Sequence, residues 1–106
     1  MTKVYEKLNN ISIPVAYGHF REDEVIEVPY IIFSCNKKLV SADSEVYYHT
    51  YSFNIELYYR GMDIDIEEKF RNELYEIKKI VDYEQTILDK YILLRATFEI
   101  IEGEIN

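Results

Sequence analysis

The chain has 106 residues, the length of one domain, so residues 1–106 are predicted to fold as a single domain around one hydrophobic core. Twenty acidic and 12 basic residues give a formal net charge of -8. This balance excludes a protein that grips nucleic acid through a basic surface, because too few cations are present to displace counterions from phosphate.

Neither a disulfide framework nor a membrane segment is predicted. Cys35 is the one cysteine, so no intramolecular disulfide can form and nothing indicates an oxidising compartment. The N-terminus lacks the apolar core of a signal peptide, and no apolar run approaches the roughly 20 residues that span a bilayer. We therefore expect the protein to be made and assembled in the cytoplasm.

A short helix is predicted over residues 2–11, where Val4, Leu8 and Ile11 recur at helical spacing. Pro14 ends this helix and favours an extended chain after it, because the residue before a proline avoids the helical region.

A strand is predicted over residues 25–35, with apolar side chains on both faces. Pro29 lacks an N–H group, which places it at a sheet edge or a bulge. Residues 36–45 are mostly polar and are predicted to form a loop.

Residues 46–59 show the clearest pattern in the chain, because apolar and aromatic residues occupy the odd positions and polar residues occupy most of the even positions. The odd positions hold Tyr47, His49, Tyr51, Phe53, Ile55, Leu57 and Tyr59. At about 3.4 Å per residue, such a strand would span nearly 48 Å, more than a domain of this size needs. Either the strand bends or one end leaves the body as an arm.

An amphipathic helix is predicted over residues 65–80, with Asp63 or Asp65 as its N-terminal cap. Its apolar stripe consists of Ile66, Phe70, Leu74 and Ile77. Glu67 and Glu68 are predicted to lie in the first turn, and Lys78 and Lys79 in the last turn, as the helix dipole favours.

Two further strands are predicted, over residues 82–87 and 92–101. Helices and strands then alternate in blocks, which is typical of an α+β fold. We predict an antiparallel or mixed β-sheet packed with one long amphipathic helix (about 65–80) and the short N-terminal helix.

No catalytic residue, cofactor site or metal site is predicted. His49 lies on the apolar phase of the long strand, and Cys35 ends an apolar run, so both are interpreted as packing residues. His19 beside Arg21 could support acid–base chemistry, but nothing completes such a site. The acidic run 63–68 lacks the glycine and spacing of a calcium loop and is explained by a helix N-terminus.

Tyrosine is the unusual feature that remains, since 11 of the 16 aromatic residues are tyrosines. Tyr48 and Tyr58 fall on the polar phase of the long strand, which is typical of a protein contact surface as well as of ordinary strand composition. We predict a subunit interface on the strand and the loop before it. Its residues are Tyr47, Tyr48, Tyr58, Lys37, Lys38 and Asp43.

An ordered series of short stretches resembles the small tail-terminator or tail-completion proteins of phages and prophages of Gram-positive bacteria. The series is Ile13-Pro14-Val15-Ala16-Tyr17-Gly18-His19-Phe20, then Val28-Pro29-Tyr30-Ile31-Ile32-Phe33, then Ser41-Ala42-Asp43-Ser44-Glu45-Val46-Tyr47, then Phe53-Asn54-Ile55-Glu56-Leu57-Tyr58, and finally the acidic helix with Glu73-Leu74. Together these stretches extend over nearly the whole chain.

The resemblance implies a structural role and no enzymatic activity. Such proteins form a ring, typically a hexamer, that ends the tail tube on the side of the head and joins it to the neck. The implied partners are further copies of the chain, the tail tube protein, and sheath, neck or connector proteins. DNA would pass the lumen without specific binding, and the implied location is the virion tail.

Three alternatives remain open at this level. The chain could be another neck or tube-end subunit, or a small intracellular regulatory or antitoxin-type binding module. A hydrolase acting through His19 and Arg21 is the third.

Overall fold

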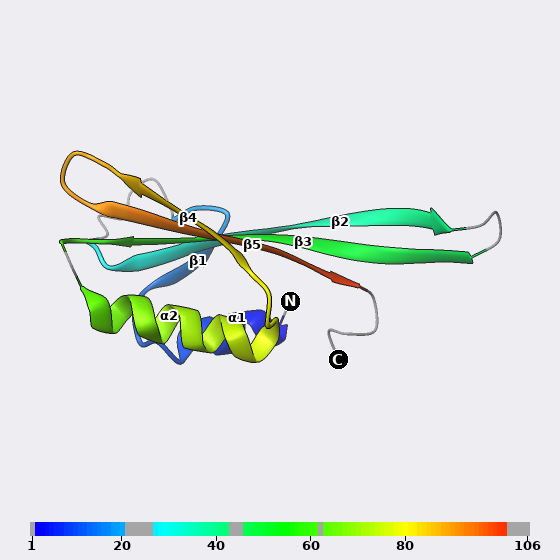
Figure 1. Ribbon diagram of the computed structural model, residues 1–106, viewed down its shortest axis with the longest axis horizontal. Helices are drawn as coiled ribbons and strands as arrows, with labels where there is room; N and C mark the ends of the chain where they lie inside the picture. Colours follow the sequence, from blue (N-terminus) through cyan, green and yellow to red (C-terminus); the bar gives the residue numbers. More distant parts are fainter. Residues whose placement is uncertain (1, 21–26, 43–45, 62, 102–106) are drawn as a thin grey trace.

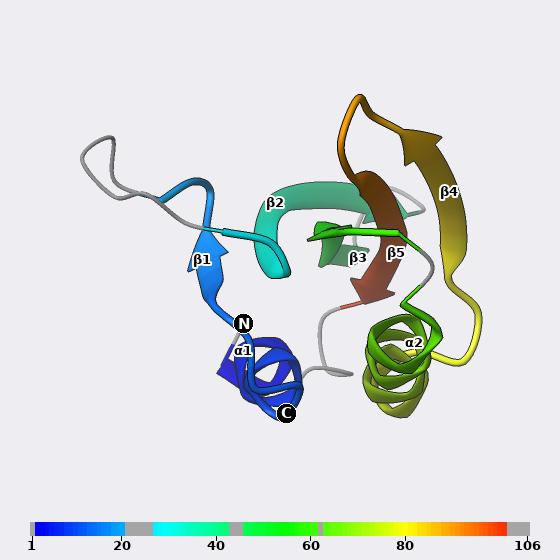
Figure 2. The same ribbon diagram turned by 90° about the vertical axis from the view of Figure 1, so that its left-hand side faces the viewer.

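The computed structural model describes residues 2–20, 27–42, 46–61 and 63–101, with the backbone alone for residues 2, 40–42 and 46–48. The elements are α1 (Thr2–Asn9), β1 (Val15–Tyr17), β2 (Tyr30–Ala42), β3 (Val46–Tyr59), α2 (Ile64–Ile77), β4 (Asp82–Ile87) and β5 (Ile92–Ile101). The predicted α+β class is confirmed, because one five-stranded sheet carries both helices on one face (Figures 1 and 2).

The sheet is mixed, with the strand order β1-β2-β3-β5-β4. β1 runs parallel to β2, and every other neighbouring pair is antiparallel. The predicted strands over 46–59, 82–87 and 92–101 are confirmed as β3, β4 and β5.

The hairpin of β2 and β3 is much longer than the strands beside it. All 13 residues of β2 pair with β3, from Tyr30 opposite Tyr58 to Ala42 opposite Val46. β1 reaches only Phe33, and β5 reaches only Thr50. Residues 36–42 of β2 therefore extend past β1, and residues 46–49 of β3 extend past β5; we call these two stretches the arm, and its far end projects from the body (Figure 1).

The dimensions of the molecule show that the long strand becomes an arm and does not fold back. The principal extents are 50 × 31 × 24 Å, and the radius of gyration is 15.2 Å. A compact domain of this length would have a radius of gyration of about 13 Å.

The predicted loop over 36–45 is wrong for residues 36–42, which belong to β2, while 43–45 lie outside the described residues. Residues 36–42 are mostly polar because solvent reaches them, so their sequence pattern does not indicate a strand. They form a strand because their backbone is hydrogen-bonded to β3. The predicted strand over 25–35 also begins later, at Tyr30, after a cis Val28–Pro29 peptide bond. Pro29 cannot donate to a ladder and lies just before the strand.

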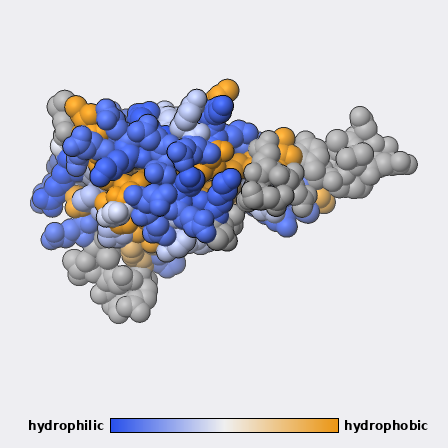
Figure 3. Space-filling view, turned by 90° about the horizontal axis from the view of Figure 1, so that it is seen from below, coloured by the Kyte–Doolittle hydropathy of each residue, from blue (hydrophilic) through white to orange (hydrophobic). Residues whose placement is uncertain are grey.

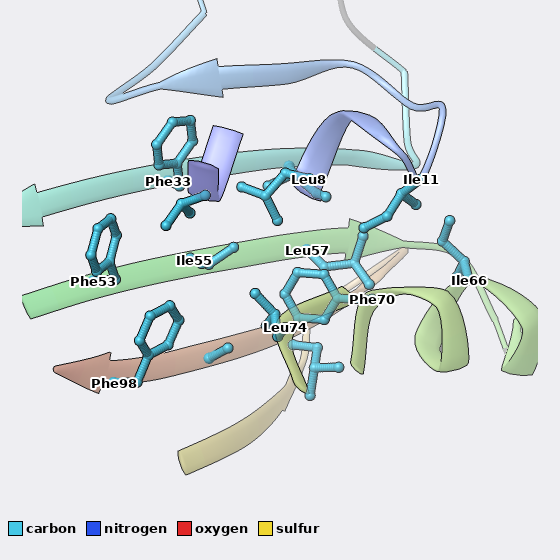
Figure 4. Packing of buried hydrophobic residues seen from close by; sticks show 14 of the residues in the cluster. Leu8, Ile11, Phe33, Phe53, Ile55, Leu57, Ile66, Phe70, Leu74 and Phe98 are labelled. Carbon is cyan, nitrogen blue, oxygen red and sulfur yellow. The ribbon is translucent and has the colours of Figure 1, made fainter. Parts of the chain in front are cut away.

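The hydrophobic core lies between the sheet and the two helices (Figure 4). Alternate residues of β3 and β5 point to this side, and the rings of Phe53 and Phe98 stack with centroids 5.2 Å apart. From α2, the predicted stripe is confirmed: Ile66, Phe70 and Leu74 are buried, and Ile77 packs against them in part.

The two helices lie side by side across this core (Figure 2). Lys7 of α1 pairs with Glu76 of α2, and this contact lowers the pKa of the Glu76 carboxyl. Asn10 donates to Glu73 over 3.4 Å. The helix-bearing side of the molecule is mostly hydrophilic, with hydrophobic residues in small patches (Figure 3).

Helix α2 is 14 residues long, shorter than the predicted 65–80. Its N-terminus is capped as predicted, since the Asp63 carboxylate accepts from the N–H of Ile66 over 3.2 Å. Its C-terminus is not as predicted, because Lys78 is already extended and Lys79 follows it, so neither lies in the last turn. The chain leaves the helix here to bring β4 alongside β5, and sheet pairing outweighs helix propensity. Among the described residues, no helix has the length and apolar character needed to cross a membrane.

We expect Phe70→Ala to lower the free energy of unfolding by about 3–5 kcal/mol, because Phe70 is fully buried between α2 and the sheet and its loss leaves a cavity. Tyr75→Ala is the control on the same helix, and its 58% exposed side chain predicts a change within about 0.5 kcal/mol. Urea unfolding followed by circular dichroism measures both. Equal effects would place the core elsewhere.

Candidate protein-interaction surface

The sheet face opposite the helices, here called the outer face, has no helix over it (Figure 2). Strand pairing places its side chains in rows that cross the sheet from β2 to β4. One row is Tyr30, Tyr58, Leu93 and Thr86; the next is Ile32, Glu56, Arg95 and Glu84; the third is Ser34, Asn54, Thr97 and Asp82. A shorter fourth row is Asn36, Ser52 and Glu99. The outer face therefore passes from aromatic, through charged, to polar residues toward the arm.

An ion pair occupies the middle of the outer face. Arg95 donates to one carboxylate oxygen of Glu56 through two nitrogens, over 2.7 and 3.2 Å. This hydrogen bonding raises the pKa of the Arg95 guanidinium and so keeps it charged. Glu84 lies farther from Arg95, at 3.8 Å, and its side chain is 72% exposed. The Arg95–Glu56 pair thus fixes β3 against β5 on this face.

Aromatic rings cover the end of the outer face that is farthest from the arm. The rings of Tyr30 and Tyr58 stack with centroids 4.8 Å apart, and Phe20 meets Tyr30 edge-on at 5.5 Å. The Tyr58 hydroxyl donates to Glu56 over 3.4 Å. Burial raises the pKa values of both tyrosine hydroxyls, so they stay protonated near neutral pH.

A groove of about 690 Å³ lies at the other end, where the arm leaves the body. Polar residues of the third and fourth rows line it, and Ser52 donates to Glu99 there over 3.1 Å. Two isoleucines also line the groove: Ile80 is 82% exposed and Ile101 is 46% exposed. Asp82 adds a carboxylate to the lining of the groove. Such a lining suits a polypeptide segment, because it offers hydrogen-bonding groups beside apolar contacts.

Two stretches of strand edge lie near the arm and the groove. β1 stops opposite Phe33, and the Tyr17 hydroxyl donates to the Cys35 carbonyl over 3.2 Å, so within the described chain residues 36–42 of β2 have no strand on the edge that faces away from β3. On the opposite side of the sheet, β4 begins at Asp82, opposite Thr97. Residues 98–100 of β5 therefore have no described strand on that side. Exposed strand edges present N–H and C=O groups to any chain that can pair with them.

The structure separates the residues predicted as an interface. Lys37 and Lys38 are exposed on the arm, and the Lys37 ammonium lies 5.7 Å from the centre of the Tyr51 ring. Tyr58 lies in the body instead, half-buried against Tyr30. The backbone of Tyr47 and Tyr48 belongs to the arm, their side chains lie outside the description, and Asp43 lies outside the described residues.

Several residues of this surface had no signal in the sequence that singled them out. Ile80 lies three residues after Ile77, within the helix predicted over 65–80, so its spacing indicates a helical core position, and Glu99 belongs to the ordinary polar phase of a strand. Arg95 is 39 positions from its partner Glu56, so only strand pairing brings the two together. The alternation of serine and asparagine on β2 and β3 is the one local hint of a polar face.

The residues weighed for catalysis lie on different elements. His19 is exposed after β1, and Arg21 lies outside the described residues. His49 is half-buried on the arm, and Cys35 is half-buried on β2, where burial raises the pKa of its thiol. Among the described residues, no three histidine, cysteine, aspartate or glutamate side chains gather as a metal site would require.

Comparison with known proteins adds no assignment for this surface. No family model matches the chain, and no curated protein matches it either. Its function must therefore be inferred from the arm, the groove and the charge of the chain, together with the resemblance in sequence.

We expect Arg95→Ala to lower the free energy of unfolding by about 1–2 kcal/mol, because the half-buried carboxylate of Glu56 then loses its two charge-assisted hydrogen bonds while solvent compensates in part. Glu84→Ala removes only a distant, exposed partner and should change stability by about 0.5 kcal/mol or less. Urea denaturation of both variants measures the difference. If both variants lost the same free energy of unfolding, Arg95 would act through the overall charge of the face and not through its contact with Glu56.

We expect the Cys35 thiol to react slowly with iodoacetamide at pH 8, because a raised pKa leaves less thiolate at a given pH. Unfolding the chain in urea should restore the ordinary pKa and speed the alkylation severalfold. Mass spectrometry of timed samples follows the reaction. Faster alkylation of the folded chain than of the unfolded chain would instead indicate an activated cysteine.

Proposed function

We propose that this protein is a virion structural subunit that forms a ring, hexameric by the family resemblance, at the head-proximal end of a phage tail tube. The ring ends the growth of the tube and provides the joining surface for the neck. The protein would be assembled in the bacterial cytoplasm and would remain in the virion tail.

The observation that carries this proposal is the arm. An isolated two-stranded hairpin is at best marginally stable in water, so a projecting hairpin gains stability from a partner. Leu39 on the arm is 60% exposed, so a partner that covers it would bury further apolar surface. A projecting contact element that belongs to a small body fits assembly from repeated subunits.

The charge of the chain fits passage of DNA through such a ring. A net charge of -8 repels phosphate, and the polar end of the outer face carries Asp82 and Glu99 among neutral side chains. Lys37 and Lys38 of the arm are one of two adjacent lysine pairs in the chain, with Lys78 and Lys79, and two cations are too few for strong phosphate binding. A ring of this composition would let DNA pass without holding it.

The proposed partners follow from the position of the ring. One surface of the ring would contact the last tail tube subunits, and the opposite surface would meet the neck or connector proteins and, in a contractile tail, the sheath. Termination requires that only one surface matches the tube, because a second matching surface would allow the tube to grow past the ring.

We expect deletion of the gene from its native phage or particle cluster to give overlong tubes of irregular length without heads, because nothing then competes with the addition of tube subunits. Electron microscopy of the particles measures tail length. A plasmid copy of the wild-type gene should restore uniform tails, and so should a copy in which His19, His49 and Cys35 are all replaced, since no catalysis is proposed. Tails of normal uniform length joined to heads in the deletion strain would contradict the function.

A further inference from the structure

We propose that the arm of one copy of this chain docks in the groove of a second copy, where residues 36–42 of β2 add a strand to residues 98–100 of β5. This inference rests on the proposed ring and names the contact that would build it. The occupant of the groove is thus another copy of the same chain.

The first support is that the two strand edges complement each other. The arm presents a run of seven residues of β2, 36–42, whose edge on the side away from β3 has no strand beside it in the described chain. The groove borders the part of β5 that extends past the start of β4. In the body, β1 covers the edge of β2 and β4 covers the edge of β5. Beyond the ends of β1 and β4 both edges are open, and there the two edges of different copies can pair. Pairing of these edges would give hydrogen-bond partners to backbone groups with which no strand of the described chain pairs.

The second support is that the side chains match in character. Leu39 of the arm and Ile80 of the groove are both exposed, at 60% and 82%, and would bury apolar surface against each other. The strands of the arm carry Lys37 and Lys38 and no carboxylate, although Asp43 and Glu45 lie between these strands in the sequence. The groove carries Asp82 and Glu99 against one ammonium, Lys78.

The third support is geometric. The open edge of β2 points toward the β1 side of the sheet, and the open edge of β5 points toward the β4 side. These sides are opposite, because the strand order is β1-β2-β3-β5-β4. A contact between opposite edges is head to tail, so each copy donates one arm and accepts one arm. Such a contact generates a closed ring when the rotation between copies closes, whereas a contact between like edges would stop at a dimer.

Charge reversal tests the contact. We expect Lys37→Glu with Lys38→Glu to weaken self-assembly by about tenfold or more, and Asp82→Lys with Glu99→Lys to do the same, because like charges then face each other. Combining all four changes in one chain should restore assembly. Lys69→Glu and Glu68→Lys, at exposed positions on α2, are the matched controls and should assemble as the wild type does. Native mass spectrometry and sedimentation over a concentration series measure assembly, and circular dichroism confirms that each variant is folded.

A second pair of variants tests the apolar part of the contact. Ile80→Ser should weaken assembly, whereas Ile87→Ser should not, although Ile87 is equally exposed at 81% and lies at the far end of β4. A carbodiimide, which joins an amine to a carboxylate in direct contact, should link Lys37 or Lys38 of one chain to Asp82 or Glu99 of another. Mixing isotope-labelled with unlabelled chains identifies such links as intermolecular.

The outcomes separate this contact from the proposed function. If the wild type forms rings and all charge variants behave like the controls, the arm does not occupy the groove, while the ring itself stands. If the arm lysines were linked only to tail tube protein, the groove would not be occupied by the arm of a second copy, and this contact would be disproved. If the wild-type chain stays monomeric at every concentration and in assembled particles, the contact and the ring fail together.

Discussion

The pairing of β2 with β3 is the interaction on which the rest of the structure depends. Its ladder includes every residue of β2, and its inner half provides two central strands of the sheet, against which β1, β5 and both helices assemble. Its outer half extends past all of them. Because side chains alternate across a strand with a period of two, this one register also decides which residues face the helices and which form the outer face.

The two halves of the ladder are stabilised differently. In the inner half, Ile31, Phe33, Ile55 and Leu57 are buried beneath the helices, so burial of apolar surface adds to the hydrogen bonds. In the arm, the described side chains of residues 36–39 are all exposed, so burial adds little there to the hydrogen bonds of the hairpin. The body is thus a stable platform, and the arm is the part that gains most from a partner.

The outer face connects this architecture to assembly. The Arg95–Glu56 pair and the stacked tyrosines give one end of the face internal partners, whereas the groove at the other end leaves polar groups and isoleucines open to a second chain. The arm and the groove lie on opposite edges of the sheet, so the proposed contact lets each subunit bind two neighbours through different surfaces. In the ring that we propose, the acidic charge of the subunits would keep the lumen from holding DNA.

The sequence by itself determined β3, β5 and the buried stripe of α2, because one-sided burial imposes a local period of two or 3.6 residues that can be counted along the chain. It also determined the acidic balance and limited the N-terminal cap of α2 to Asp63 or Asp65, of which the structure shows Asp63. Tertiary structure alone decided that residues 36–42 are a strand, since their order comes from hydrogen bonds to β3 and leaves no apolar pattern. It also decided where α2 ends, because the chain must leave the helix there for β4 to reach β5. Finally, it decided which residues form the groove. Ile80, Glu99 and Ser34 come from segments far apart in the chain, and no local periodicity can encode a contact that depends on strand order.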